Sequence, residues 1–324
     1  MGKGLIAINE KIPVLAVCGA TASGKTALAV QLAKHFNGEV VSSDSMQIYR
    51  GMDIGTAKPT VEEMQGVPHH MIDVADIDCN FSVSDYCEAA HSIISDIHSR
   101  HKLPVLAGGT GLYVDSLLND IDFNRGVYDE VAREKYVKLS ETVSEAELHK
   151  MLEELDPEAA AQIHMNNVKR VIRALEHIES TGEKFSDYKK RAAEKESRYN
   201  AFMLFIDRDR EELYQRIDMR VDIMVKDGLI DEARRIYDRG YSRELTSMGA
   251  IGYKELFDSF DGKCTVDEAV ELIKQSSRRY AKRQLTWFRR NENLCHIQAG
   301  DGMFEAAVTE VKKWLEAIDG KIQL

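Results

Sequence analysis

The chain has 324 residues, enough for a large core and a second, smaller unit, with 44% hydrophobic and 30% charged residues. This balance is typical of a soluble globular protein, and no apolar run reaches the roughly 18 residues of a membrane helix, so we expect no membrane partner. The first 13 residues lack the apolar stretch and cleavage site of a signal peptide. Five cysteines without a CxxC pair argue against a disulfide framework or a structural zinc site and favour a cytoplasmic protein.

The net charge of −11 does not by itself favour a nucleic acid as partner. Net charge averages over the whole surface, however, whereas a nucleic acid responds to a local patch of positive charge. The useful question is therefore whether the 43 basic residues cluster anywhere along the chain.

Strands and helices alternate in the first third of the chain. Short apolar runs predict buried strands at 14–18, 39–41 and 103–107, and helical periodicity predicts helices at 26–36 and 83–98. This order indicates an α/β fold of the P-loop type, with a parallel sheet flanked by helices on both faces.

The pattern changes after Leu118. Residues 128–181 are helical in pattern and rich in charge, residues 201–206 return to a strand, and the remainder from 209 onward is mostly helical. The simplest interpretation is an all-helical insertion between two parts of one core. We therefore predict a first part of the core, a helical insertion that contacts RNA, and a return strand with C-terminal helices, at residues 1–121, 122–197 and 198–324.

A phosphate-binding motif, GxxxxGK[ST], lies between the first predicted strand and the first predicted helix, which is the context that supports it. Its glycines let the backbone wrap around an anion, and the amides and helix N-terminus favour negative charge. We expect Lys25 to reach the terminal phosphate and Thr26 to bind Mg²⁺, the one expected cofactor. The predicted diphosphate-binding residues are Gly19, Ala20, Thr21, Ala22, Ser23, Gly24, Lys25 and Thr26.

A carboxylate, Asp44, follows the second predicted strand, whereas the strand at 103–107 runs into a glycine turn without one. Enzymes that hydrolyse ATP usually place an aspartate after such a later strand to support Mg²⁺. Ligands of open α/β sheets bind at the carboxyl ends of the strands, so Asp44 is expected to face the phosphate site. A helix N-cap is an equally good interpretation of Asp44.

Several long motifs follow one another in an order that resembles the bacterial tRNA dimethylallyltransferases, also called tRNA isopentenyltransferases. The resemblance spans about residues 14 to 300, and one departure is Ala20, where the family often has proline. The matching segments are 43–59 (SDSMQIYRGMDIGTAKP), 68–70 (PHH), 108–113 (GGTGLY), 166–176 (NNVKRVIRALE), 249–254 (GAIGYK) and 282–289 (KRQLTWFR).

The resemblance implies two substrates, dimethylallyl diphosphate and the anticodon stem-loop of tRNA. The acceptor is then N6 of the adenosine on the 3′ side of the anticodon, and Asp44 is expected to act as general base for its proton. Lys25, Thr26 and Mg²⁺ would stabilise the diphosphate leaving group. The family also implies an RNA-contacting arginine early in the insertion, which Arg133 matches. One RNA per chain is sufficient, so we expect a monomer.

Arg216 and Arg220 are four residues apart, so they share one face of a predicted helix. One interpretation is a diphosphate clamp, in which Arg220 has a catalytic role. The alternative is an exposed stripe that pairs with Asp218 and Asp222.

The basic residues do cluster, because residues 277–290 contain six of them and no acidic residue. Helical spacing places Ala281, Leu285 and Phe288 on one face and the positive charge on the other. A solvated helix face usually mixes both signs, so this stripe favours RNA binding. The RNA-binding residues predicted in this segment are Arg278, Arg279, Lys282, Arg283, Gln284, Thr286 and Arg289.

Further RNA contacts are expected around the adenine, which has to leave its stack to reach a buried diphosphate. The segment after the second strand could read the edge of the base, the glycine turn could contact the flipped nucleotide, and the insertion could hold the loop. These predicted RNA-binding residues are Asp44, Ser45, Met46, Gln47, Thr110, Asn166, Asn167, Lys169, Arg170 and Lys254.

Two other classes of function remain alternatives. A small-molecule kinase would share the phosphate loop and the α/β core, but would leave the basic segment unexplained. A non-catalytic RNA-binding module would leave Lys25, Thr26 and Asp44 without a purpose.

Overall fold

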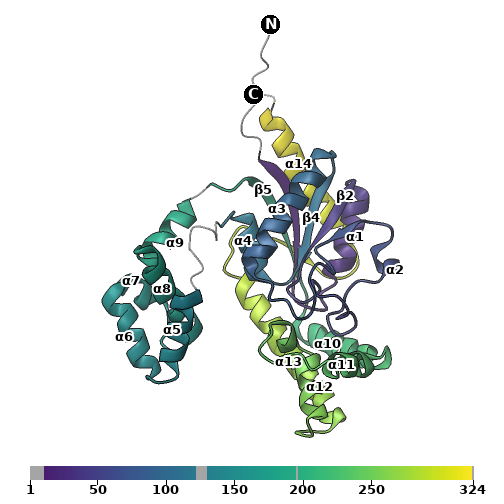
Figure 1. The fold of residues 1–324 in the computed structure, drawn as a ribbon. Helices are drawn as coiled ribbons and strands as arrows, with labels where there is room; N and C mark the ends of the chain where they lie inside the picture. Colours follow the sequence, from purple (N-terminus) through teal and green to yellow (C-terminus); the bar gives the residue numbers. More distant parts are fainter. Residues whose placement is uncertain (1–10, 122–129, 195, 323–324) are drawn as a thin grey trace. The chain divides into compact units, whose positions relative to one another are not determined.

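The structure is a computed structural model that describes residues 11–121, 130–194 and 196–322. The chain forms two compact units, one made of Met1–Leu118 with Arg198–Leu324 and the other of Asn119–Ser197 (Figure 1). The predicted domain boundary at residue 122 lies outside the described residues. Among the residues that are described, no helix is both long enough and apolar enough to cross a membrane.

A six-stranded, fully parallel sheet in the order β3-β2-β4-β1-β5-β6 forms the centre of the larger unit. It confirms the predicted α/β fold. The two edge strands that the sequence pattern did not indicate, β3 and β6, are only two and four residues long. The strands are β1 (Ile12–Cys18), β2 (Gly38–Ser43), β3 (His69–His70), β4 (Leu103–Gly108), β5 (Tyr199–Asp207) and β6 (Cys295–Gln298).

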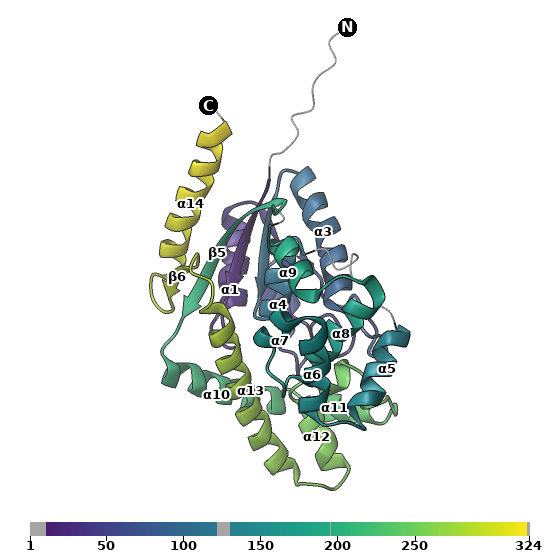
Figure 2. The same ribbon diagram turned by 90° about the vertical axis from the view of Figure 1, so that its left-hand side faces the viewer.

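Helices cover both faces of this sheet, because the central strands bury side chains on both sides. On one face lie α1 (Lys25–His35) and α14 (Met303–Ile322), and on the other α3 (Val83–Ser99) and α4 (Gly111–Leu118) (Figures 1 and 2). The core under α1 and α14 includes Leu15, Leu32, Val105 and Val311. The carboxyl ends of β1, β2 and β4 are thereby fixed side by side.

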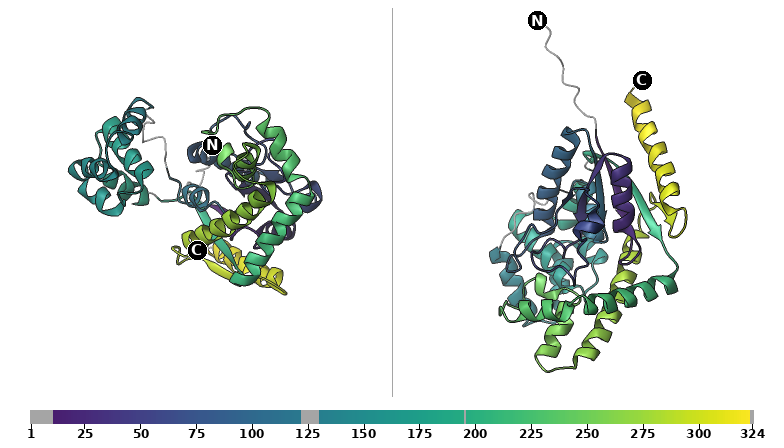
Figure 3. Two further views of the ribbon diagram at one scale, coloured as in Figure 1. Left: turned by 90° about the horizontal axis from the view of Figure 1, so that it is seen from below. Right: turned by 90° about the vertical axis from the view of Figure 1, so that its right-hand side faces the viewer.

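A helical subassembly of the same unit lies below the carboxyl ends of the strands, as the right panel of Figure 3 shows. It has its own core, in which Leu229, Tyr253 and Phe257 are at most 1% exposed. The short helix α2 (Val61–Met64) precedes β3. The elements of the subassembly are α10 (Arg210–Lys226), α11 (Leu229–Tyr237), the 3-10 turn η2 (Ser247–Gly249), α12 (Tyr253–Phe260) and α13 (Val266–Phe288).

The smaller unit consists of helices around a separate apolar core that includes Leu148, Leu152 and Leu175. Asp156 is fully buried in it and caps α7, and it also accepts hydrogen bonds from Ser186. These helices are α5 (Glu130–Ser140), α6 (Glu145–Leu155), α7 (Pro157–Gln162), α8 (Val168–Thr181) and α9 (Phe185–Glu194).

Candidate active site

The phosphate loop connects β1 to α1, and one of its glycines, Gly24, is needed for its shape. Gly24 precedes α1 with a φ of 101°, in the left-handed region that favours glycine. A Cβ on Gly19 would lie 2.6 Å from Oγ of Ser23, so a side chain at this position would force that hydroxyl to turn away. Ala20 and Ala22 are buried against Leu213 and Ile217. The loop therefore packs against two side chains of the helix at 210–226, and Gly24 gives it its turn.

Three side chains from distant parts of the chain bind successive peptide groups of this loop. Oε1 of Gln284 accepts a hydrogen bond from N–H of Thr21 at 2.8 Å. Arg216 donates from Nε to the carbonyl of Ala22 at 3.1 Å, and Arg208 donates from Nη2 to that of Ser23 at 3.3 Å. These contacts fix the loop backbone without any ligand.

Gln284, which the sequence predicted as an RNA contact, is buried with only 4% exposure. Its Nε2 donates to the carbonyl of Gly109 at 2.9 Å, so one amide connects the phosphate loop to the glycine turn after β4. Its position assigns Gln284 to holding two loops together instead of contacting RNA. Helical periodicity in the sequence could have predicted the burial of Gln284, because this residue lies one turn from the buried Ala281 and Phe288.

Lys25 and Thr26 begin α1 and are both half-buried. Nζ of Lys25 donates to the carbonyl of Ala20 at 3.4 Å. Burial, reinforced by the positive charge of Arg220, lowers the pKa of Lys25 to about 8, although Asp44 acts in the opposite direction. A cation held under this penalty is suited to a site that receives an anion.

Asp44 follows β2, and one of its carboxylate oxygens has a structural role. Its Oδ1 accepts hydrogen bonds from N–H of Met46 at 2.9 Å and of Gln47 at 3.3 Å, which cap the turn after the strand. Among the described residues, none donates a hydrogen bond to Oδ2. Asp44 also lines the cavity described below, so the cap and a role in chemistry are compatible.

The neighbouring residues hold the same region together. N–H of Ser45 donates to Oγ1 of Thr110 at 3.2 Å, which joins the segment after β2 to the glycine turn. Gln47 donates from Nε2 to the carbonyls of Thr56 and Ala57, at 3.3 and 3.1 Å. Thr110 and Gln47, predicted to contact RNA, therefore position the backbone around Asp44.

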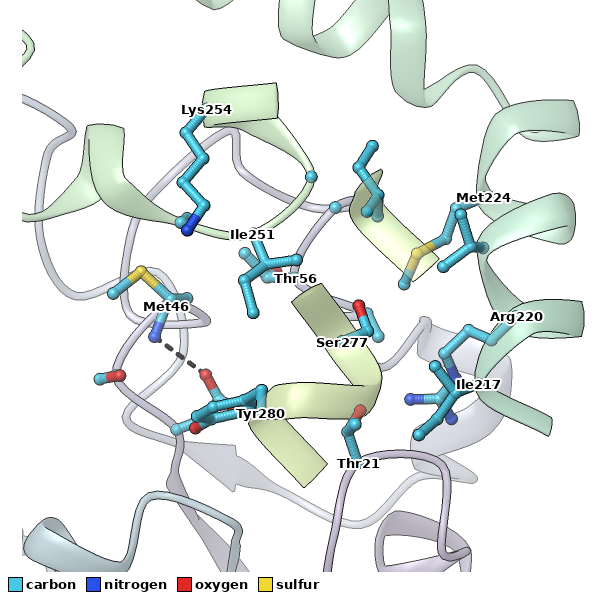
Figure 4. Close-up of a pocket in the computed structure, with 18 of the residues that line it drawn as sticks. Thr21, Met46, Thr56, Ile217, Arg220, Met224, Ile251, Lys254, Ser277 and Tyr280 are labelled. Carbon is cyan, nitrogen blue, oxygen red and sulfur yellow. Dashed lines mark hydrogen bonds between the residues drawn. The ribbon is translucent and has the colours of Figure 1, made fainter. Parts of the chain in front are cut away.

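A cavity of about 260 Å³ lies between the phosphate loop, the end of β2 and the helical subassembly. Figure 4 shows Ile217, Arg220 and Met224 projecting into it from α10, with Met46 and Lys254 across from them. Its polar lining residues are Thr21, Asp44, Ser45, Thr56, Arg220, Lys254, Ser277, Tyr280 and Arg283, and its apolar ones are Met46, Gly55, Ala57, Ile217, Val221, Met224, Gly249, Ala250, Ile251, Gly252 and Ile273.

The two arginines of α10 have different positions. Arg220 is half-buried and lines the cavity, whereas Arg216 is exposed and contacts the phosphate loop from outside the cavity. The alternative pairing is not observed, because Asp218 pairs with Arg278 and Asp222 with Lys274. Both arginines therefore belong to the phosphate end of the site.

Sequence reasoning did not identify Ser277, Tyr280 or Arg208. Ser277 and Tyr280 share the inner face of α13 with Ile273 and Gln284, a spacing that helical periodicity could have revealed. Burial and the nearby charge of Asp44 raise the pKa of Tyr280 to about 12, so its hydroxyl stays protonated. Arg208 directly follows β5, and the carboxyl end of that strand was the available signal.

The outer face of α13 carries exposed positive charge. Arg279, Lys282 and Arg289 are exposed, as is Thr286, and no acidic side chain among the described residues pairs with these three cations. Arg278 differs, because it pairs with Asp218. The guanidinium of Arg283, at the cavity, lies 5.5 Å from the centre of the Tyr280 ring.

The predicted contacts in the smaller unit lie on or beside two of its helices, α5 and α8. Asn166, Asn167, Lys169 and Arg170 are exposed around the beginning of α8. Arg133 lies on α5, where its Nη1 is 3.6 Å from Oε2 of the buried Glu176.

Comparison with known proteins places this arrangement in a family. The family model described as IPP transferase matches residues 47–291. A tRNA dimethylallyltransferase of Halalkalibacterium halodurans is 47% identical over 98% of this chain and 99% of its own length.

Two solved structures are also similar. The full-length tRNA isopentenylpyrophosphate transferase of Bacillus halodurans has a TM-score of 0.74 and 45% identity, over 97% of this chain and 100% of its own. A eukaryotic dimethylallyltransferase acting on tRNA has a TM-score of 0.77 and 30% identity, over 89% of this chain and 74% of its own. The chain therefore belongs to the IPP transferase family of tRNA dimethylallyltransferases, which are prenyl-transferring enzymes.

Proposed function

We propose that this enzyme transfers the dimethylallyl group of dimethylallyl diphosphate to N6 of the adenosine on the 3′ side of the tRNA anticodon. The observation that carries the proposal is one cavity lined by Thr21 of the phosphate loop, by Arg220, by an apolar wall and by the carboxylate of Asp44. In the reaction the allylic C–O bond breaks, its electron pair leaves with the diphosphate, and a bond forms from N6 to the allylic carbon. The proton of N6 passes to Asp44.

The phosphate end would receive the leaving group. Negative charge grows on the diphosphate as the C–O bond breaks, so fixed amides and cations there stabilise the transition state. Burial lowers the pKa of Lys25 to about 8, and an incoming diphosphate would favour its protonated form. Arg220, at the wall of the cavity, adds a second positive charge.

Mg²⁺ fits this end when the substrate supplies most of its ligands. Among the described residues, no group of three or more His, Cys, Asp or Glu side chains could hold a metal. Mg²⁺ is commonly bound by one or two protein oxygens, substrate phosphates and water, so the Thr26 hydroxyl at the start of α1 is a suitable protein ligand. The ion would neutralise charge on the diphosphate.

The adenine would approach from the side of Asp44. An exocyclic amine is a weak nucleophile, and a carboxylate that accepts its proton strengthens it. Because Oδ1 already holds the turn amides of Met46 and Gln47, Oδ2 is the oxygen we assign to the base. Lys254 and Arg283 also line the cavity and carry charges suited to the RNA backbone.

The basic outer face of α13 would bind the RNA phosphates. Two of the exposed cations, Arg279 and Lys282, belong to the helix whose inner face lines the cavity through Ser277 and Tyr280, and Arg289 follows directly at its C-terminus. One helix therefore connects the RNA surface to the reaction site.

The test is transfer of label from dimethylallyl diphosphate to unmodified tRNA in the presence of Mg²⁺, followed by nuclease digestion and identification of the labelled nucleoside. We expect label only in N6-dimethylallyladenosine from the position next to the anticodon. Consumption of ATP with a phosphorylated acceptor and no prenylated nucleoside would favour a kinase. RNA binding without any transfer would favour a non-catalytic module.

A further inference from the structure

A buried carboxylate outside the cavity, Glu232 on α11, accepts hydrogen bonds from four donor groups. It is only 3% exposed. Its oxygens accept from the backbone N–H groups of Asp53 at 3.1 Å, Ile54 at 3.0 Å and Gly55 at 3.1 Å, and from the hydroxyl of Tyr253 at 2.6 Å. Three consecutive amides that converge on one carboxylate fix the course of the backbone there.

The amides belong to a loop that forms part of the cavity wall. Gly55, Thr56 and Ala57 line the cavity, and Gly55 is itself one of the donors to Glu232. The ring of Tyr253 fills the space beside this glycine, because a Cβ there would lie 2.5 Å from the ring. The loop thus rests on a side chain that Glu232 also holds.

The fourth donor connects Glu232 to a second part of the wall. Tyr253 is fully buried at the beginning of α12, and the residues just before it line the cavity. Glu232 itself does not line the cavity, so it can act only through the backbone that it holds. The wall residues next to Tyr253 are Ala250, Ile251 and Gly252.

The cavity that these two segments enclose is small and largely apolar on this side. Ile217, Val221, Met224 and Ile273 complete the apolar lining, and the volume is about 260 Å³. The length of the apolar group that this side accepts therefore depends on where the two wall segments stand, and a displaced wall would leave room for a longer chain.

We propose that Glu232 is a positioning residue that holds the loop at Asp53–Ala57 against the start of α12 and thereby restricts the enzyme to a five-carbon allylic group. This inference rests on the proposed function, since it concerns the prenyl donor of that reaction. Glu232 restricts the donor by fixing the spacing of two wall segments and touches neither substrate.

The test is the ratio of kcat/KM for dimethylallyl diphosphate to that for geranyl diphosphate, with unmodified tRNA as acceptor. Glu232→Gln keeps the size of the side chain but turns an amide N–H₂ towards donors that need an acceptor. Tyr253→Phe removes one donor and keeps the ring. The matched control is Glu39→Gln, a carboxylate 2% exposed at the start of β2, which binds Arg100, Lys102 and His70.

We expect the ratio to fall roughly tenfold in Glu232→Gln, the scale of discrimination by small differences in an apolar pocket, and less in Tyr253→Phe. Glu39→Gln should keep the wild-type ratio, even if it lowers the melting temperature as much as Glu232→Gln does. If both single variants fold and both keep the wild-type ratio, the inference is overturned. If Glu232→Gln does not fold, the ratio of Tyr253→Phe decides alone. Absence of transfer by the wild type from either donor would instead overturn the proposed function itself.

Discussion

The two ends of the cavity are built in different ways. Most of the phosphate end comes from one continuous segment, Gly19–Thr26, whose conformation depends on Gly24 and on the start of α1. The apolar end is assembled from α10, η2, α13 and the loop at 54–57. A phosphate loop can thus be encoded by a short local motif, whereas the shape of the apolar end depends on tertiary packing across most of the larger unit.

This contrast is not complete, because the local motif also depends on distant residues. Gln284, Arg216 and Arg208 each bind a peptide group of the phosphate loop. Ile217, which lines the cavity, packs beneath the same loop. Changes at these positions should reveal how much of the phosphate end is truly local.

The largest effect is expected from Gln284→Ala, which tests whether the phosphate loop keeps its conformation without a distant side chain. The substitution leaves N–H of Thr21 and the carbonyl of Gly109 without their partner, which costs about 1–3 kcal/mol of the free energy of unfolding. Misplacement of the loop should lower kcat/KM for prenyl transfer by roughly 10- to 100-fold. Urea unfolding and initial-rate kinetics measure the two effects. Gln275→Ala, an exposed glutamine on the same helix, is the control, and equal behaviour of both variants would show that the loop holds itself.

A second effect concerns the pKa of Lys25, which burial lowers to about 8 in the free enzyme. Diphosphate needs the ammonium form, so affinity for an unreactive analogue of dimethylallyl diphosphate should fall by up to about tenfold per pH unit above pH 8. The analogue itself is fully ionised above roughly pH 7.5. Titration calorimetry from pH 7 to pH 10 measures this dependence.

The contribution of Lys25 to protein stability changes with pH in the opposite direction to its contribution to affinity. The folded state binds fewer protons at Lys25 than the unfolded state between pH 8 and the ordinary lysine pKa of 10.5, so this residue makes folding more favourable as pH rises through that window. Lys25→Arg stays charged and should show a flat affinity profile. A wild-type profile as flat as that of the variant would exclude Lys25 as the titrating group.

The smallest effect is expected on the outer face of α13. Arg279→Ala combined with Lys282→Ala should weaken tRNA binding severalfold and reduce the slope of log K against log salt by roughly 1 to 2, the change expected for the loss of two phosphate contacts. The affinity for the prenyl diphosphate analogue should not change. Lys312→Ala on α14, an exposed lysine on another helix, serves as the control. An unchanged salt slope in the double variant would place the RNA elsewhere.

The sequence predicted the parts of the fold that local pattern determines. The strands β1, β2, β4 and β5 each contain a short apolar run, and the structure confirms them. The strand β3 has two residues, and its identity depends on pairing with β2, which no local pattern records.

The site could be predicted only in part for a similar reason. The phosphate loop is a contiguous motif, and its position between β1 and α1 is as predicted. The inner face of α13 was not recognised, because Tyr280 and Gln284 lie between exposed cations in the sequence. In the structure these two side chains point into the protein. Glu232 binds residues 53–55, which are 177 to 179 positions away in the sequence. This contact depends on tertiary packing, which no local pattern records.

The most direct test of the account is single-turnover transfer of labelled dimethylallyl diphosphate to unmodified tRNA by Asp44→Asn. Asparagine retains an oxygen that can accept from Met46 and Gln47, so the turn after β2 is preserved while the base is lost. The account predicts a rate at least roughly 10²-fold below that of the wild type, with unchanged affinity for the diphosphate analogue and for tRNA. A rate within about threefold of the wild type would contradict it and leave Asp44 as a structural cap only.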